Sequence, residues 1–309
     1  TKFENLIGQS QAMQEVFDLI QEVAPTESTV LITGETGTGK ELVAKAIHTR
    51  SSRAQGPFVA VNCGALPEHL MESELFGHQK GAFTDAKSTR KGRLELAFGG
   101  SLFLDEVGEI SLRMQIDLLR VLEERIFYRV GGTQPIEADF RVIAATNKDL
   151  EQAIQDKSFR SDLYYRLKVI CIHIPPLRQR KEDIPLLADH FRLRFTQETN
   201  KEVNSISREA ADEMMLYDWP GNVRELENAI ERAVVVGKSR SIQPRDLPIF
   251  REDQSRAKKS RSLRELEKEH ISSVLEQTSG NIKKSAEILG IDRSTLYHKL
   301  KRYGLSKKS

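Results

Sequence analysis

The chain has 309 residues, of which 39% are hydrophobic and 30% charged, as expected of a soluble globular protein with two or three domains. Its net charge of +2 is unevenly distributed, because residues 251–309 hold 15 Lys and Arg against 8 Asp and Glu, while residues 1–250 hold 32 against 37. A basic tail on an acidic body indicates that the tail meets a polyanion. No run of about 18 apolar residues occurs, which excludes a membrane-spanning helix.

The chain begins Thr1-Lys2-Phe3-Glu4, with neither an initiator Met nor the apolar segment of a signal peptide. We therefore expect a fragment, with a further domain upstream. The two cysteines, Cys63 and Cys171, lie far apart and lack metal-ligand spacing. They are expected to be small buried residues of strands, in a protein of the reducing cytoplasm.

Residues 1–175 alternate short apolar runs with helical patterns. The predicted strands are residues 29–33, 58–61, 101–104, 141–145 and 169–174. Their Val, Ile and Leu content without polar alternation indicates a parallel sheet covered on both faces, with the intervening helices as crossovers.

A proline-rich joint at residues 174–177 ends this pattern. Residues 176–250 are predicted to form a small helical subdomain, with helices only as far as about Val236 and breaks at residues 204–207 and 219–221. Residues 251–262 lack apolar periodicity and are predicted to be a solvated linker. Residues 263–309 form a third, helical unit.

A glycine-rich segment joins the first predicted strand to a helical run: Gly34-Glu35-Thr36-Gly37-Thr38-Gly39-Lys40. This order is the context of a P-loop, in which backbone N–H groups and a helix N-terminus surround phosphate oxygens. Lys40 is expected to reach the β- and γ-phosphates, so the segment predicts ATP binding. Glu41 stands where Ser or Thr usually ligates Mg²⁺, so the metal must depend on other groups.

Two such groups, Asp105 and Glu106, follow the strand predicted at residues 101–104. Asp105 is predicted to hold Mg²⁺ through water, and Glu106 to orient and polarise the attacking water. Because this acidic strand end follows a P-loop in the sequence, it predicts ATP hydrolysis.

Three further polar residues are candidates for the same site. Asn147 follows the strand at residues 141–145 and either contacts the γ-phosphate or caps the helix that starts near Asp149. Arg160 and Arg166 either contact the transferred phosphate or are solvated surface charges. Their spacing alone favours surface charge.

Residues 281–303 show the pattern of two helices joined at Gly290, each with one apolar face. The outward polar residues are candidate DNA contacts: Lys283, Lys284, Arg293, Ser294, Thr295, His298, Lys299 and Arg302. Residues 281–309 hold 8 Lys and Arg against 2 Asp and Glu. This charge favours a helix-turn-helix that enters the major groove over a generic helical hairpin.

Five motifs together resemble the bacterial enhancer-binding proteins, the NtrC-like AAA+ ATPases that activate transcription by sigma-54 RNA polymerase. They are residues 34–41, 75–78, 81–84, 102–106 and 219–226. The resemblance covers residues 3 to about 303. It implies an α/β AAA+ P-loop NTPase with a helical lid, followed by an all-α Fis-type helix-turn-helix whose preceding helix, about residues 263–278, supports dimerisation. The implied partners are sigma-54 RNA polymerase, double-stranded enhancer DNA and neighbouring copies in a ring of six or seven.

The resemblance also implies roles around the nucleotide. Glu41 is usual at its position in the family. Ile7 and Gly8 would flank the adenine, and Arg224 would be the sensor arginine that reaches the nucleotide from the lid of its own subunit.

Further roles concern the control of hydrolysis. Arg160 and Arg166 are implied to be arginine fingers that enter the site of the neighbouring subunit. Asn62 resembles the residue that holds Glu106 aside until nucleotide and partner are correctly arranged.

The signature loop of the family contacts sigma-54, and here it reads Gly81-Ala82-Phe83-Thr84-Asp85-Ala86. Phe83 and Thr84, which make the contact in the family, are retained, whereas Asp85 replaces a glycine. The alternative for Phe83 is an ordinary core position. Residues 129–135 have hairpin turn chemistry and resemble the second pore-side loop, which supports the first.

Two readings follow. In the first, a DNA-tethered ring uses ATP turnover to drive loops bearing Phe83 against sigma-54. In the second, the chain is a DNA-binding regulator in which nucleotide only sets the oligomeric state, because Asp85 has abolished remodelling. A generic AAA+ machine would lack the Phe83 loop.

Overall fold

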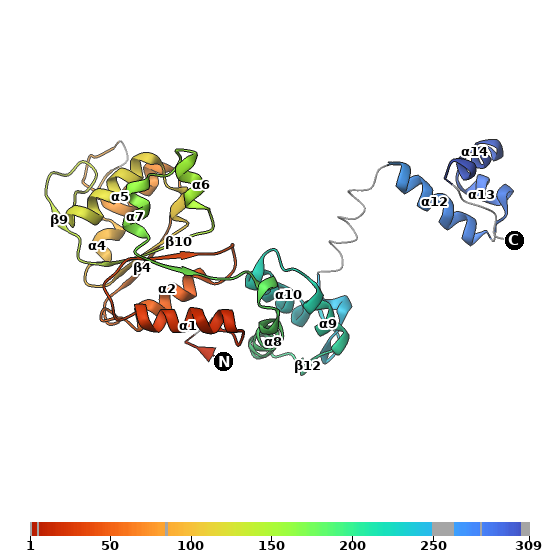
Figure 1. Ribbon diagram of the computed structural model, residues 1–309, viewed down its shortest axis with the longest axis horizontal. Coiled ribbons are helices and arrows are strands. Elements are labelled where there is room, and N and C mark those ends of the chain that lie inside the picture. Colours follow the sequence, from red (N-terminus) through yellow and green to blue (C-terminus); the bar gives the residue numbers. More distant parts are fainter. Residues whose placement is uncertain (1, 5, 84–85, 249–262, 279, 304–309) are drawn as a thin grey trace. The chain divides into compact units, whose positions relative to one another are not determined.

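The computed structural model describes residues 2–4, 6–83, 86–248, 263–278 and 280–303 (Figure 1). Thr84, Asp85 and the linker predicted at residues 251–262 lie outside the described residues. The chain divides into two compact units, Thr1–Leu247 and Pro248–Ser309.

The first unit is built on a five-stranded sheet in the order β11-β3-β10-β7-β4, with every pairing parallel. The strands are β3 (Val30–Thr33), β4 (Phe58–Asn62), β7 (Ser101–Asp105), β10 (Arg141–Thr146) and β11 (Ile170–His173). All five predicted strands are therefore confirmed, each with its ends within one residue of the predicted positions.

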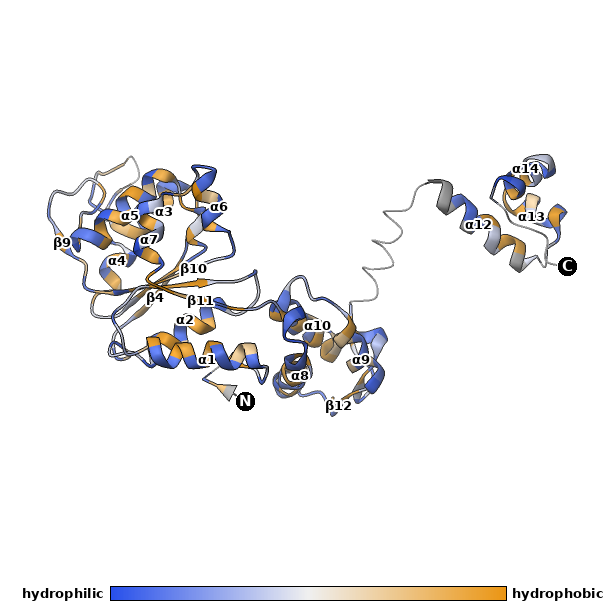
Figure 2. Ribbon diagram, in the orientation of Figure 1, coloured by the Kyte–Doolittle hydropathy of each residue, from blue (hydrophilic) through white to orange (hydrophobic). Residues whose placement is uncertain are grey.

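Successive strand residues face opposite sides of the sheet, so each strand contributes to two apolar layers. Ile32 belongs to the layer that packs with α1 and α2, and its neighbour Leu31 to the layer that includes α5 and α7. These helices are α1 (Gln11–Val23), α2 (Lys40–Thr49), α5 (Leu112–Glu124) and α7 (Ser161–Leu167). In Figure 2 the sheet strands carry the hydrophobic colour, whereas the surrounding helices show both colours.

Shorter elements connect this framework. The helices are α3 (Glu68–Phe76), α4 (Arg93–Leu96), α6 (Leu150–Gln155) and the 3-10 turns Val107–Glu109, Leu177–Gln179, Lys181–Asp183 and Pro244–Asp246. Three antiparallel strand pairs join β1 (Lys2–Phe3) with β2 (Leu6–Ile7), β5 (Gly77–His78) with β6 (Arg90–Lys91), and β8 (Ile126–Phe127) with β9 (Ile136–Glu137).

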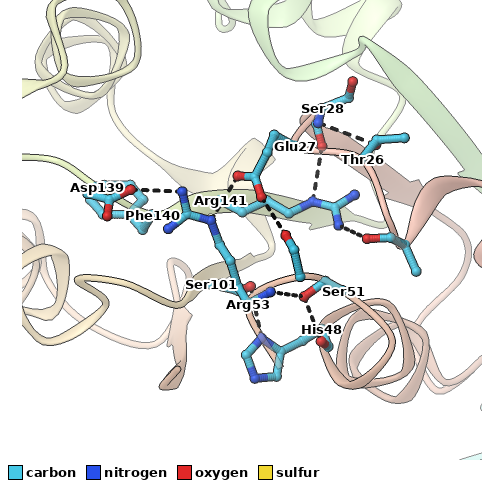
Figure 3. A network of polar contacts seen from close by, with 12 residues as sticks. Thr26, Glu27, Ser28, His48, Ser51, Arg53, Ser101, Asp139, Phe140 and Arg141 are labelled. Carbon is cyan, nitrogen blue, oxygen red and sulfur yellow. Dashed lines mark hydrogen bonds and ion pairs between the residues drawn. The ribbon is translucent and has the colours of Figure 1, made fainter. Parts of the chain in front are cut away.

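A buried polar network supports the amino end of the central strands (Figure 3). Arg141, which begins β10, is 1% exposed and donates to three backbone carbonyls of residues 23–28 at 2.7–3.2 Å. These carbonyls lie at and after the end of α1, where a helix leaves acceptors without partners. Arg53 pairs with Glu27 and Asp139 beside it. The network therefore secures the end of the sheet opposite the P-loop.

The lid follows the sheet as three long helices: α8 (Ile184–Thr199), α9 (Arg208–Leu216) and α10 (Asn222–Val236). The break predicted at residues 204–207 lies between α8 and α9 and contains the short strand β12 (Ser205–Ile206), which pairs with β13 (Ser241–Ile242) beyond the end of α10. A strand of two residues is too short to show the alternation of polar and apolar side chains.

Trp219, just before α10, is fully buried, and its Nε1 donates to Met214 O at 2.8 Å.

The second unit contains α12 (Leu263–Gln277), α13 (Ile282–Ile288) and α14 (Arg293–Tyr303). Its core consists of Ile271, Ile282, Ala286, Leu296 and Leu300, which includes the apolar faces expected of the last two helices. Among the described residues, no helix is long and apolar enough to cross a membrane.

The cysteines differ from expectation. Cys63 is buried directly after β4, but Cys171 is exposed on β11, so the prediction of two buried thiols is wrong for Cys171. The physical reason is position, because β11 is an edge strand of the sheet.

Candidate functional site

The P-loop lies between the carboxyl end of β3 and the start of α2. Gly37 and Gly39 have φ values of 80° and 104°, which glycine adopts at little cost. Lys40 is 6% exposed, and its Nζ donates to the carbonyl oxygens of Gly34 at 3.0 Å and Glu35 at 3.3 Å. The lysine ammonium is thus held inside the loop that would surround phosphate.

The two carboxylates predicted for hydrolysis stand next to this lysine. Glu106 Oε1 lies 3.6 Å from Lys40 Nζ, and Glu106 itself has a φ of 54°. Burial raises the pKa of the Asp105 carboxyl, and the negative charge of Glu106 raises it further. A divalent cation would favour the ionised form of Asp105, so this donor set fits Mg²⁺.

The two asparagines contact different partners. Asn147 donates from its backbone N to Glu106 Oε2 at 3.1 Å and from Nδ2 to Thr36 Oγ1 at 3.0 Å. The side chain of Asp149, and not that of Asn147, caps α6. Asn62 Oδ1 accepts from Gly64 N at 3.0 Å, so in this structure Glu106 is held by Asn147 and Lys40.

One cleft of about 350 Å³ brings most of the candidates together. Its lining includes Thr36, Gly37, Gly39, Lys40, Glu41, Asn62, Asp105, Glu106 and Arg224. Carboxylates, the P-loop and a lid arginine therefore face one space of suitable size for phosphates.

A second hollow of about 460 Å³ shares Gly39 and Leu42 with this cleft. Ile7 lines it, together with Leu187 and Phe191 of the lid helix α8. These apolar side chains suit the face of an adenine ring, while Arg180, Arg194 and Glu227 line other parts of the hollow. Gly8 lies alongside, where an added Cβ would come within 2.9 Å of Met13 Cβ.

The two candidate finger arginines lie apart from the phosphate cleft of their own chain. The Arg160 guanidinium forms a bidentate pair with Asp162, and its backbone N donates to Gln115 Oε1 at 2.8 Å. Arg166 donates to Leu122 O at 2.9 Å. Neither lines the cleft that contains Arg224.

Two residues that sequence reasoning missed, Arg178 and Asn222, lie where the lid meets the P-loop and contact the predicted P-loop residue Glu35. Glu35 directs its carboxylate to Arg178, and Asn222 donates to the same carboxylate. The hydrogen bonds from Arg178 lower the pKa of Glu35 to about 2, and Asn222 adds to the effect. The nearest signal in the sequence was the position of Asn222 two residues before Arg224.

The loop bearing Phe83 joins β5 to β6. Phe83 is 44% exposed and lies edge-on to His78, so the alternative of an ordinary core position is excluded. The segment between β8 and β9 supports this loop, because Gln79 N donates to Val130 O at 3.0 Å and a Cβ on Gly131 would lie 2.8 Å from Ala82 Cβ.

The candidate DNA contacts lie mostly on exposed surface. Lys283, Lys284, Arg293, Ser294, Thr295, His298 and Arg302 are exposed. Lys299 is half-buried and forms an ion pair with Glu267 of α12, which also accepts from Tyr303 Oη. Asn281 caps α13 by accepting from Lys284 N at 3.2 Å.

Three protein families match consecutive parts of the chain. Residues 6–173 match the sigma-54 interaction domain, residues 178–264 the AAA+ ATPase lid domain, and residues 262–303 the bacterial regulatory proteins of the Fis family.

Relatives match almost the whole chain. The transcriptional regulatory protein ZraR of Escherichia coli K12 is 52% identical over 301 residues, covering 96% of this chain and 68% of ZraR. The regulatory protein AtoC of the same strain is 47% identical over 313 residues, covering 97% of this chain and 68% of AtoC.

Solved structures of NtrX from Brucella abortus are also similar. The NtrX complex with ATP is 38% identical with a TM-score of 0.76, covering 97% of this chain and 69% of NtrX. The complex with ADP gives the same identity and TM-score, covering 99% of this chain and 70% of NtrX. On these matches, the chain belongs to the sigma-54-dependent transcriptional activators, AAA+ ATPases that carry a Fis-type helix-turn-helix.

Proposed function

We propose that the chain works as an ATP-hydrolysing ring, bound to upstream enhancer DNA, that remodels the closed complex of sigma-54 RNA polymerase. The observation that carries the proposal is the single cleft shared by Lys40, Asp105, Glu106 and Arg224. Asp105 would hold Mg²⁺ through water, and the metal would neutralise charge on the phosphates.

Each side chain has a task in this proposal. Lys40 binds the β- and γ-phosphates, and Arg224 contacts them from the lid. Glu106 takes a proton from the attacking water, so its carboxylate must leave Lys40 and Asn147. Asn62 lines the same cleft and would have to turn from Gly64 N to hold Glu106 aside in the inactive arrangement.

The ring supplies what one chain lacks. Arg160 and Arg166 lie outside the cleft of their own chain, which supports a role in the cleft of a neighbouring copy. Exposed Phe83 carries the contact with sigma-54, together with the rest of residues 81–86. We expect six or seven copies, with dimerisation through α12.

Residues 1–175 and 176–250 form the motor, and residues 263–309 hold the DNA. Because the relatives are bacterial regulators of transcription, we place the protein in the cytoplasm. The DNA contacts are the exposed residues of α13 and α14, with Arg293, Ser294 and Thr295 at the start of the second helix.

Glu106→Gln tests the proposal. The variant keeps the size of the side chain but removes the base, so ATP should still bind while turnover and sigma-54 open-complex formation are lost. Equal transcription by the variant and the wild type would instead support the regulator in which nucleotide only sets the oligomeric state. Total ATPase activity should also rise more than linearly with protein concentration, because each site is completed by a neighbour.

A further inference from the structure

The N-terminus of the lid helix α10 is satisfied by the P-loop. Val223 N and Arg224 N donate to Gly37 O at 3.0 and 3.3 Å. A helix leaves its first N–H groups without internal partners, and α10 has no side-chain cap of its own. A carbonyl of the P-loop therefore serves as its cap, and the start of α10 follows the position of that peptide.

Three side chains reinforce this junction. Asn222 is fully buried and has a φ of 53°, a conformation that Asn tolerates better than most residues. Its Nδ2 donates to Glu35 Oε2 at 3.1 Å and Thr36 O at 3.0 Å, and its Oδ1 accepts from Leu177 N at 2.8 Å. The side chain of Asn222 is thus hydrogen-bonded to the P-loop and to the joint between sheet and lid. Asn222 is also the first residue of α10, so it connects both to that helix.

Arg178 completes the junction from the same joint. Its Nη1 and Nη2 donate to the two carboxylate oxygens of Glu35 at 2.8 and 2.5 Å. A bidentate arginine–carboxylate pair fixes direction as well as distance. Glu35 is consequently turned toward the lid, although it stands in the middle of the phosphate-binding sequence. We call Glu35, Arg178 and Asn222 the lid bracket.

We propose that the lid bracket positions Arg224 over the phosphate cleft, so that Glu35 acts on hydrolysis through the lid arginine and not through the nucleotide. Arg224 follows Asn222 by two residues in the first turn of α10, and it lines the cleft with Lys40 and Glu106. A change of orientation at Asn222 therefore displaces the Arg224 side chain directly. The inference rests on the role proposed above for Arg224.

A double-mutant cycle tests the bracket. We expect Glu35→Gln and Arg178→Ala each to lower kcat about two- to fivefold, the range for an exposed ion pair, with less effect on KM for ATP. Asn222→Asp places a carboxylate against Glu35, and about tenfold or more should be lost because buried partners go unsatisfied. Arg178→Lys keeps the charge and should recover part of the loss.

The decisive comparison repeats these substitutions in an Arg224→Ala background. If the bracket acts through Arg224, Glu35→Gln has no further effect there. Rates are measured at saturating ATP and at protein concentrations where specific activity no longer rises. If steady-state turnover in Arg224→Ala is too slow to measure, the single-turnover rate of ATP hydrolysis with protein in excess provides the same cycle.

The outcomes separate the two ideas. Wild-type turnover and nucleotide affinity in Arg224→Ala would refute the role of Arg224. If Arg224→Ala lowers turnover, and Glu35→Gln then lowers it by the same factor in Arg224→Ala as in the wild type, the bracket is refuted and the role of Arg224 is kept. Glu202→Gln is the matched control, since it removes the exposed 2.7 Å pair with Arg240 in the lid and leaves Arg178 and the P-loop untouched. It should behave as wild type. Thermal unfolding verifies that each variant folds. If Asn222→Asp does not fold, the Glu35 and Arg178 variants decide the question.

Discussion

Gly37→Ala should loosen the lid in the absence of any nucleotide. An added Cβ would lie 2.3 Å from Gly221 O, well inside contact distance, so the P-loop and the start of α10 must separate. Gly39→Ala is the matched control, because its φ of 104° strains alanine at least as much while no atom lies within 4 Å of the new Cβ.

The structure gives the expected difference between the two variants. In both variants, the left-handed backbone conformation destabilises the folded state by about 1–2 kcal/mol once alanine replaces glycine. This cost is partly offset by about 0.4–1 kcal/mol, because alanine lowers the conformational entropy of the unfolded chain. Only Gly37→Ala also loses the hydrogen bonds from Val223 N and Arg224 N, worth about 0.5–1.5 kcal/mol each. It should therefore be less stable than Gly39→Ala by about 1–3 kcal/mol.

Thermal unfolding of the nucleotide-free proteins measures this difference. For a unit of this size, about 2–4 °C accompanies each kcal/mol, so the melting temperature of Gly37→Ala should lie about 2–12 °C below that of Gly39→Ala. Equal melting temperatures would show that the P-loop carbonyl does not hold α10, and would contradict the contact on which the lid bracket depends.

Other predictions concern single side chains. Arg160→Ala should abolish turnover and spare ATP binding; normal turnover would remove its finger role. Burial lowers the pKa of His48 below 6.5, so its contribution to stability is complete above about pH 6.5 and is lost as the pH falls through the folded-state value. The free energy of unfolding of His48→Gln, measured with denaturant, should accordingly depend less on pH in that range. The same pH dependence in the variant and the wild type would show that His48 is not its source. Arg293→Ala should weaken specific DNA binding more than Lys299→Ala, because Lys299 is paired with Glu267; the opposite order in a footprinting titration would place Lys299 on the DNA.

The sheet and the helix-turn-helix were predictable because their signals are local. Buried parallel strands such as Arg141–Thr146 are apolar on both faces, and their ends can be read from composition. The grouping of Lys40 with Asp105 and Glu106 followed from the same logic, since the carboxyl ends of parallel strands meet at one edge.

Contacts between distant segments were not predictable in this way. Asn222 and Arg178 bond Glu35 across 187 and 143 residues of sequence, and no local pattern reports such a meeting. The pairing of Glu267 with Lys299 depends on how α12 packs against α14. Exposure of Cys171 likewise depends on strand order, which apolar runs do not specify.

The anchoring of the Phe83 loop has a mechanical consequence. Val130 N donates to Gly77 O at 2.9 Å and Val130 O accepts from Gln79 N at 3.0 Å, so a second chain segment is fastened across the base of the loop. That segment continues back through β8 into α5, which starts a few residues after Glu106. A load applied at Phe83 is therefore shared between two stretches of backbone, and one of them leads to the carboxylate that faces the phosphates. How far the Phe83 loop moves when the site around Glu106 changes therefore depends on the stiffness of the loop base. It does not depend only on which residues stand at the tip.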